Sequence, residues 1–191
     1  KGGARLEQFY AQPFCTPTRA ALMTGRYPFR TDVSKWPTQP LIDEGQTTIA
    51  SLLREAGYAT AMVGKWHMGD HDLSIPTEFG FDKFFGTYHS NDMTPFNLHE
   101  GRHGGPEKLA VAAPVDQTQL NQIYGDKAEE FIAAAPRNKP MFLYFAHNFP
   151  HVPLYAAAHE HGRSDAGLYG DVVQGLDDTV GRVVASLKKR G

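Results

Sequence analysis

The sequence predicts an α/β protein in which helices flank a parallel or mixed β-sheet. Two short apolar runs, residues 58–64 and 141–146, are typical of strands, and the second is continuous in the manner of a buried central strand. Segments with helical periodicity alternate with these runs along the chain. The 191 residues, of which 41% are hydrophobic and 21% are charged, have the composition of one globular domain.

The first part of the chain is predicted to hold a short strand, two helices and a loop. Residues 5–10 are a strand candidate, and residues 16–24 are predicted to form a helix that ends at Gly25. Residues 27–43 contain three prolines and are predicted to be a loop. Apolar side chains spaced i, i+3 and i+4 predict an amphipathic helix over residues 47–56.

The second part is predicted to hold a long loop and two longer helices. Residues 69–114 are rich in Gly, Pro, Asn, Asp and His, and loops of this length are usually functional or mobile. Residues 120–135 and 166–189 carry apolar side chains on one side and are predicted helices. Because sites in α/β sheets lie beyond the carboxyl ends of strands, attention falls on the residues just after Val63 and Phe145.

Charge, hydropathy and cysteine content exclude several classes of protein. The 19 Lys and Arg against 21 Asp and Glu give a net charge of −2, which argues against a nucleic-acid partner. The longest apolar runs are far shorter than the ~20 residues that span a bilayer, so no membrane span is expected. The single cysteine, Cys15, excludes an internal disulfide framework and a cysteine-based zinc cluster.

The first candidate for chemistry is the stretch 15–19, which reads Cys-Thr-Pro-Thr-Arg. A lone cysteine is most often a small buried hydrophobe. Here Pro follows at +2 and Arg at +4, and positions i and i+4 share one face of a helix. Because a helix N-terminus attracts anions, Cys15 and Arg19 together form a plausible site for a tetrahedral oxyanion.

Lys65 and His67 follow the strand predicted over residues 58–64. In an extended chain these two side chains project to the same side, while Trp66 turns into the packing. A fixed ammonium beside an imidazole can bind an oxyanion and shuttle a proton. The alternative is a pair of solvated side chains at a strand end, which is the commoner case for any Lys-x-His sequence.

His151 lies in a loop directly after the strand predicted over residues 141–146. Prolines at positions 150 and 153 stiffen this loop and hold the imidazole in place, although a turn with an incidental histidine is the alternative. Ser90 opens a Ser-Asn-Asp stretch within the long loop. This stretch is either polar lining of a site or simple turn chemistry.

Taken together, these motifs resemble those of the type I sulfatase family. Residues 15–26 resemble its Cys-x-Pro-x-Arg signature and extension, residues 57–69 resemble its second signature, and residues 151–153 resemble a later His-x-Pro element. The stretch that begins at Ser90 and the long final helix are closest to the arylsulfatase A and galactosamine-6-sulfatase branch. The resemblance implies an alkaline-phosphatase-like mixed sheet flanked by helices.

The resemblance implies a sulfuric ester hydrolase that acts on an aryl or sugar sulfate. Cys15 would be oxidised to formylglycine by a formylglycine-generating enzyme, and the hydrated aldehyde would be the nucleophile. Arg19 would stabilise the hydrate and the bound sulfate. A divalent cation, normally calcium, would polarise the sulfate, with Cys15 as formylglycine among its ligands.

The same resemblance implies roles for the strand-end and loop residues. Lys65 and His151 would hold sulfate oxygens, and either could protonate the leaving oxygen. His67 would accept a proton from the hydrate, so that the sulfated intermediate collapses to aldehyde and sulfate. Ser90 would be a polar neighbour of the substrate.

The resemblance also implies that residues 1–191 are a partial N-terminal catalytic domain, with the sheet incomplete at both ends. The family's other metal ligands, an acidic pair upstream and an Asp-Asn pair downstream, are not in this sequence, so the piece alone is expected to be inactive. The parent protein is expected to be exported, that is periplasmic, secreted or lysosomal. Two alternatives stay open: a formylglycine-dependent phosphonate or phosphate ester hydrolase, and a non-catalytic binding module with the same fold.

Overall fold

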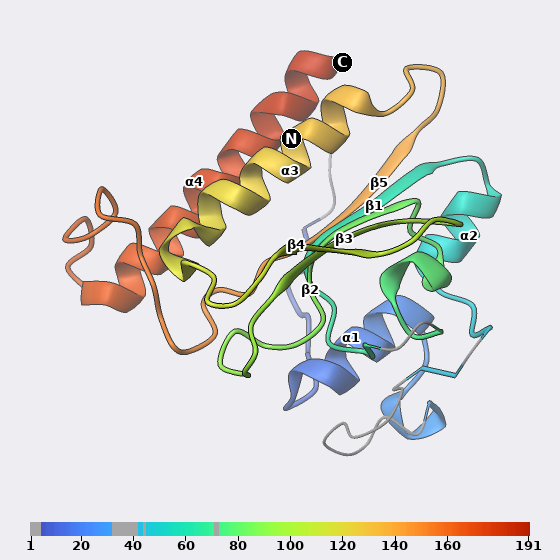
Figure 1. Ribbon diagram of the computed structural model, residues 1–191, viewed down its shortest axis with the longest axis horizontal. Coiled ribbons are helices and arrows are strands. Elements are labelled where there is room, and N and C mark those ends of the chain that lie inside the picture. Colours follow the sequence, from blue (N-terminus) through green and yellow to red (C-terminus); the bar gives the residue numbers. More distant parts are fainter. Residues whose placement is uncertain (1–4, 32–41, 44, 71–72) are drawn as a thin grey trace.

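The computed structural model describes residues 5–31, 42–43, 45–70 and 73–191 (Figure 1). The helices of this part are α1 (Cys15–Thr24), α2 (Ile49–Glu55), α3 (Leu120–Ala134) and α4 (Gly167–Arg190), with short 3-10 helices η1 (Pro28–Arg30), η2 (Pro76–Phe79) and η3 (Gln117–Gln119). The strands are β1 (Ala59–Lys65), β2 (Lys83–Thr87), β3 (Leu98–Arg102), β4 (Lys108–Val111) and β5 (Met141–Ala146). The four helices predicted from the sequence are therefore confirmed, with bounds close to those expected.

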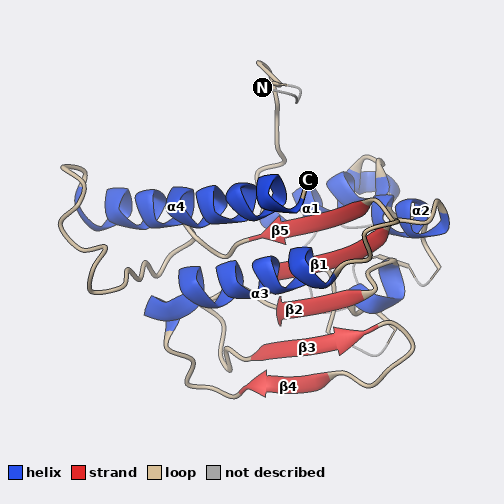
Figure 2. Ribbon diagram, turned by 90° about the horizontal axis from the view of Figure 1, so that it is seen from above, coloured by secondary structure: helices blue, strands red, loops and turns tan. Residues whose placement is uncertain are grey.

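The strands form one mixed sheet in the order β4-β3-β2-β1-β5 (Figure 2). β1 runs parallel to both of its neighbours, so that Val63 lies opposite Phe85 of β2 on one side and Phe145 of β5 on the other. β3 and β4 extend the sheet as antiparallel strands. The predicted mixed sheet is confirmed, and the carboxyl ends of β1, β2 and β5 meet at one edge.

Helices cover both faces of the sheet, with α3 and α4 on one face and α1 and α2 on the other (Figures 1 and 2). Successive side chains of a strand point to opposite faces. Accordingly, Met62 of β1 packs in a core cluster with Ala20 and Met23 of α1, whereas Ala61 packs in a cluster with Phe131 of α3. This double burial fixes the position of β1, whose seven residues are all buried.

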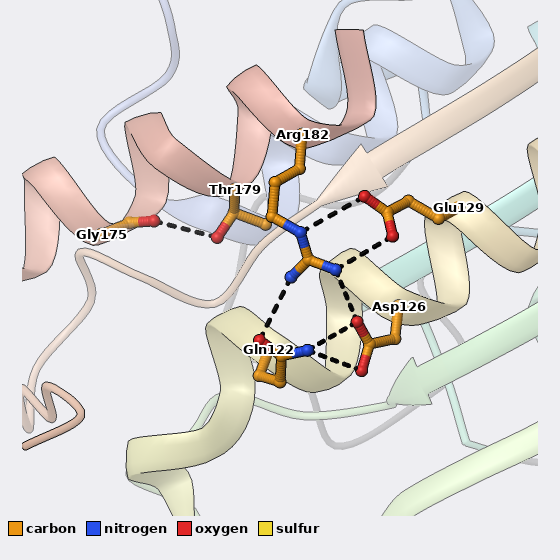
Figure 3. Close-up of polar contacts among 6 residues, drawn as sticks. All are labelled: Gln122, Asp126, Glu129, Gly175, Thr179 and Arg182. Atoms are coloured by element: carbon orange, nitrogen blue, oxygen red, sulfur yellow. Dashed lines mark hydrogen bonds and ion pairs between the residues drawn. The ribbon is translucent and has the colours of Figure 1, made fainter. Parts of the chain in front are cut away.

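α3 and α4 lie side by side (Figure 1), and a charged cluster joins them (Figure 3). Gly125 of α3 lies at this contact, where a Cβ would come within 2.9 Å of Nη1 of Arg182 and the end of that arginine side chain would have to shift. Arg182 of α4 reaches across to α3, where its Nη2 lies 2.6 Å from Asp126 and 3.0 Å from Glu129. Its Nη1 also donates to Oε1 of Gln122 at 3.3 Å. The two helices are therefore joined by paired charges.

Two predictions about which segments form strands or loops are wrong. Residues 5–10 do not form a strand, because they pair with no strand of the described sheet, and Leu6 and Tyr10 are exposed. Residues 69–114 are not one long loop, because they contain η2 and three strands. These strands are four or five residues long. Alternation over so few residues is hidden by the Gly, Pro and polar residues around them.

β5 is present as predicted, but it lies at one end of the described sheet and not at its centre. Five of its six residues are half-buried. The apolar run reflects contacts on both faces, because Phe142 and Tyr144 pack against one core cluster while Leu143 and Phe145 pack against others. An apolar run therefore indicates two covered faces without indicating a central place in the sheet.

Two further expectations bear on the rest of the chain. Residues 32–41 of the loop predicted over 27–43 lie outside the described residues. Within the described ranges, no helix is both long enough and apolar enough to cross a bilayer.

Candidate active site

Cys15 is the first residue of α1, one position further into the helix than the sequence predicts. The helix ends as predicted at Gly25, whose φ is 66° and whose N–H donates to the carbonyl of Ala21 at 2.9 Å. The thiol of Cys15 is free and half-buried, and its Sγ lies 3.1 Å from Nδ1 of His67. The sulfur is thus placed against a polar partner and not within the apolar core.

Arg19 lies one turn further along α1 and is also half-buried. Its guanidinium donates to the backbone carbonyl of Lys65, the last residue of β1. Because the guanidinium has five N–H donors in a planar fork, this one bond leaves most of its donors for other partners. The bond therefore fixes a cation at the end of β1 without neutralising it.

The backbone at the end of β1 requires a glycine and a sharp change of direction. Gly64 has a φ of 114°, and a Cβ there would lie 2.1 Å from the carbonyl oxygen of Ala146 in β5. Trp66 is fully buried and donates from Nε1 to a backbone carbonyl at 2.8 Å. His67 then adopts a φ of 60°. Its ring reaches Cys15 through this left-handed turn and not, as predicted, through continued strand alternation.

The ammonium of Lys65 is enclosed by protein. Lys65 is 1% exposed, and its Nζ donates to Oγ of Ser90 at 3.0 Å. Burial is the main cause that lowers the pKa of Lys65 to about 8, and the charge of Arg19 lowers it further, while Cys15 and Asp92 act in the opposite direction. At neutral pH the amine is therefore still a cation, in surroundings where charge–charge interactions are strong.

The imidazole of His67 is neutral. Burial, followed by the positive charges of Lys65 and Arg19, lowers the pKa of His67 to about 3. Its Nε2 is buried and has no hydrogen-bond partner among the residues that the structure describes. A neutral ring in contact with Cys15 can accept a proton, and an anion bound beside it would raise its pKa by the same electrostatics.

Ser90 connects Lys65 to His151. Its Oγ lies 3.3 Å from both ring nitrogens of His151, and Nδ1 of that ring lies 2.6 Å from the carbonyl oxygen of Val152. Because a carbonyl can only accept, Nδ1 carries a hydrogen, and in the neutral ring Nε2 is the acceptor. The Ser90 hydroxyl can therefore accept from the ammonium and donate to Nε2, which forms a continuous hydrogen-bonded path.

Buried polar residues that were not predicted individually support the loop after β5. Tyr124 of α3 is fully buried and donates from its hydroxyl to Oδ1 of Asn148 at 2.8 Å. Nδ1 of His147 accepts from the backbone N–H of Phe149 at 2.9 Å. Burial lowers the pKa of His147 to about 4, so this ring is neutral. The sequence signal for Tyr124 was its hydroxyl group, which lies on the apolar side of the helix predicted over residues 120–135.

The predicted site residues share one region at the carboxyl ends of the parallel strands: Cys15, Arg19, Lys65, His67, Ser90 and His151. They come from four separate segments, namely α1, the end of β1, and the loops that follow β2 and β5. The structure brings these residues together, and their chemical roles stay predictions.

The described residues do not by themselves form a calcium site. Calcium prefers about six to eight oxygen ligands. In the ranges that the structure describes, no group of three or more His, Cys, Asp or Glu is arranged to hold a metal ion. Two of the side chains in this region, Arg19 and Lys65, are cations that oppose a metal ion, and the ring of His67 is neutral. The described residues alone therefore do not fit calcium.

Solved structures with this arrangement of strands and helices are sulfatases of the alkaline-phosphatase-like fold. The PsFucS1 sulfatase from Pseudoalteromonas sp. superimposes with a TM-score of 0.83 and is 31% identical, over 95% of this chain and 43% of that chain. A sulfatase from Bacteroides thetaiotaomicron gives a TM-score of 0.80 at 25% identity, over 93% of this chain and 50% of its own. The predicted fold class is thereby confirmed.

The sequence comparisons identify the family. The Sulfatase family model matches residues 1–191, and the chain belongs to this family. N-acetylgalactosamine-6-sulfatase of Homo sapiens is 32% identical over 97% of this chain and 40% of its own length. Arylsulfatase G of Homo sapiens is 33% identical over 95% of this chain and 41% of its own length. The chain thus spans about two fifths of the curated relatives that it matches.

Proposed function

We propose that residues 1–191 form part of the active site of a sulfuric ester hydrolase that releases sulfate from an aryl or sugar sulfate. The observation that carries the proposal is a buried ammonium and a half-buried guanidinium beside a half-buried thiol. Within the described part of the chain, neither Arg19 nor Lys65 forms an ion pair. Uncompensated buried charge is unfavourable for folding, and an anionic substrate would supply the missing partner.

The two cations suit the oxygens of a sulfate ester. A planar guanidinium can bind two oxygens of a tetrahedral anion at once, and an ammonium acts as a point charge toward a third. Arg19 is fixed by its bond to the carbonyl of Lys65, so the fork is oriented before substrate arrives. Such preorganised charge is usually the largest contribution to stabilising a transition state.

The surroundings of position 15 suit the chemistry of a formylglycine formed from Cys15. Once hydrated, that group supplies a geminal diol with one hydroxyl to attack sulfur and a second whose proton loss releases the product. Nδ1 of His67 contacts the atom attached to Cβ at 3.1 Å, and the neutral ring can take that proton. Lys65 can deliver a proton to the leaving oxygen, and His151, joined to it through Ser90, can do so when both of its ring nitrogens carry a hydrogen. Lys65 and His151 are therefore both candidate acids.

The proposal includes a maturation partner and a location. Cys15 is converted by a formylglycine-generating enzyme, which uses molecular oxygen as the external oxidant and exchanges the sulfur and two hydrogens for an aldehyde oxygen. We expect the full-length protein to be exported, and to use a divalent cation whose ligands come largely from outside the described residues. The N-acetylgalactosamine-6-sulfatases and arylsulfatases among its relatives make sugar and aryl sulfates the substrate classes to test first.

The experiment uses the full-length protein, co-expressed with a formylglycine-generating enzyme. Mass spectrometry of the peptide that contains Cys15 is expected to show the exchange of sulfur for oxygen. Sulfate release is then measured with an aryl sulfate and a set of sulfated monosaccharides. We expect turnover of at least one sulfate ester, its loss in Cys15→Ala, and its retention in Thr24→Ala at the other end of α1.

Three results would contradict the proposal. An unmodified thiol together with no turnover indicates a non-catalytic binding module. Faster turnover of an aryl phosphonate than of every sulfate ester indicates a phosphonate or phosphate ester hydrolase. Undiminished activity in Cys15→Ala indicates a different nucleophile.

A further inference from the structure

The loop that carries His151 is held by a pair of amide side chains that the proposed mechanism does not use. Asn91 follows Ser90 in the loop after β2, and Gln117 is the first residue of η3. We propose that Asn91 and Gln117 are positioning residues that fix His151 relative to Lys65. This inference rests on the proposed function, because His151 is one of its two candidate acids.

The contacts of Asn91 join three segments that are far apart in the sequence. Asn91 is 3% exposed, and its Nδ2 lies 3.2 Å from Oε1 of Gln117, 3.0 Å from the carbonyl oxygen of Pro153 and 3.5 Å from that of His151. Gln117 returns a bond, since its Nε2 donates to the backbone carbonyl of Asn91 at 3.0 Å. The amide pair thus holds the backbone at the carbonyl of His151 and again at Pro153, two residues further along the loop.

The orientation of the Asn91 amide follows from its neighbours. Three oxygens surround Nδ2, and the two amide hydrogens are shared among them, with the 3.5 Å contact the weakest. The reversed amide would place Oδ1 against three acceptors, which is unfavourable. Oδ1 itself is buried without a partner among the described residues. The function of Asn91 therefore depends on its two donors, which a carboxylate of the same shape lacks.

The dipeptide Ser90–Asn91 reaches His151 in two ways. Ser90 binds the imidazole ring at 3.3 Å and also accepts from Lys65 at 3.0 Å, while Asn91 binds the backbone around the same histidine. If the backbone of His151 moves, the ring leaves Ser90 and the path to Lys65 opens. Asn91 and Gln117 thereby act on chemistry through His151, without contact to the reacting atoms.

The full-length protein offers a matched pair of variants. Asn91→Asp keeps the shape of the side chain but removes both donors. Asn97→Asp makes the same chemical change before β3, where Oδ1 of Asn97 only accepts, from the N–H of Ala113 at 2.8 Å, and a carboxylate can still accept. We expect Asn91→Asp to lower kcat by about 10- to 100-fold with a smaller change in KM, and Asn97→Asp to change neither.

A double-mutant cycle separates positioning of His151 from general damage. In a His151→Ala background, Asn91→Asp is expected to lower kcat by less than about twofold, because the group that it positions is already absent. Gln117→Met, which keeps the bulk of a half-buried side chain, is expected to lower kcat by about 3- to 10-fold and serves if Asn91→Asp does not fold. Unchanged kcat in a folded Asn91→Asp or Gln117→Met protein would overturn the proposal, as would fully additive losses.

A measurement without substrate distinguishes this inference from the proposed function. The imidazole signals of His151 in NMR spectra, assigned with His151→Ala, are expected to shift and broaden in Asn91→Asp or Gln117→Met and to stay unchanged in Asn97→Asp. If the wild-type protein hydrolyses no sulfate ester, the proposed function fails, and these spectra still decide whether the amide pair orders the ring. Identical His151 signals in all variants would refute the inference by themselves.

Discussion

Two clusters of charged side chains in this protein differ in whether carboxylates pair with their cations. In the cluster between α3 and α4, Arg182 is paired with the carboxylates of Asp126 and Glu129 and is 34% exposed (Figure 3). In the cluster at the strand ends, Lys65 is 1% exposed and donates to a neutral hydroxyl. Arg19, beside it, donates to a backbone carbonyl. The cation of the first cluster has carboxylate partners, whereas among the described residues the cations of the second have no ion-pair partner.

This difference separates a structural use of charge from a binding use. Paired charges between α3 and α4 join two helices and leave little attraction for another ion. At the strand ends, burial and then the positive charge of the neighbouring cations lower the pKa values of Lys65 and His67. A bound anion would relieve this repulsion. The contrast therefore predicts that matched changes in the two clusters affect different properties.

The largest expected effect comes from replacing the arginine in each cluster by lysine. Arg19→Lys keeps the charge but loses the planar fork, and we expect kcat/KM for a sulfate ester to fall by roughly 100- to 1,000-fold in the full-length protein, about 3–4 kcal/mol. Arg182→Lys is expected to leave kcat/KM within about twofold of wild type. Steady-state kinetics with one aryl sulfate measures both.

Two outcomes would break this comparison. Near-normal kinetics of Arg19→Lys would place the guanidinium outside the site, and a large loss in Arg182→Lys would show that the α3–α4 cluster takes part in activity. Thermal unfolding of both variants is the control, because a misfolded protein would lose activity for another reason.

The second prediction concerns stability and has opposite signs in the two clusters. Lys65→Met replaces a buried, unpaired ammonium by an apolar side chain, and we expect it to raise the free energy of unfolding by about 1–3 kcal/mol while it removes activity. Arg182→Met leaves the carboxylates of Asp126 and Glu129 without their partner and is expected to lower that free energy by about 1 kcal/mol. Urea unfolding at pH 7 measures both changes.

The pH dependence of these changes provides a check on their cause. The folded-state pKa of Lys65 is lowered to about 8, so between about pH 8 and the ordinary value of 10.5 the unfolded state binds more protons. The penalty from Lys65 is complete below pH 8 and diminishes as the pH rises toward 10.5. The advantage of Lys65→Met should therefore shrink over this interval. An advantage that does not change with pH would point to packing and not to charge.

The sequence predicts the helices and the two longest apolar strands well because their patterns extend over enough residues. It fails for β2, β3 and β4, since strands of four or five residues carry too little periodicity to be distinguished from loops. It also fails for residues 5–10, because a segment of mixed apolar and polar residues becomes a strand only if the edge of a sheet is available to pair with it. The place of β5 at one end of the described sheet follows from pairing, which a single run cannot encode.

The site shows the same limit. Cys15, Arg19, Lys65 and His67 can be grouped from the sequence because short motifs fix their spacing. The partnership of Asn91 with residues after β5 cannot, because it depends on how two loops meet across the sheet. The left-handed φ of His67 is likewise invisible in the sequence, since no glycine or asparagine marks it. Motifs therefore locate reactive groups, and tertiary contacts determine how these groups are held.

The smallest expected effect concerns the affinity of the protein for inorganic sulfate and how that affinity changes with pH. The protonated form of Lys65 attracts the anion and the neutral amine does not, so the affinity should be constant below about pH 8 and fall at higher pH, by at most about tenfold for each pH unit because Arg19 still attracts the anion. Bound sulfate favours the charged amine and moves the start of this decline to higher pH. Competitive inhibition of aryl sulfate hydrolysis from pH 6 to 10 measures the effect. Lys65→Arg should remove the decline, because a guanidinium stays protonated, whereas Arg182→Lys should retain it. A wild-type profile that is flat to pH 10 would show that the buried ammonium does not bind the anion.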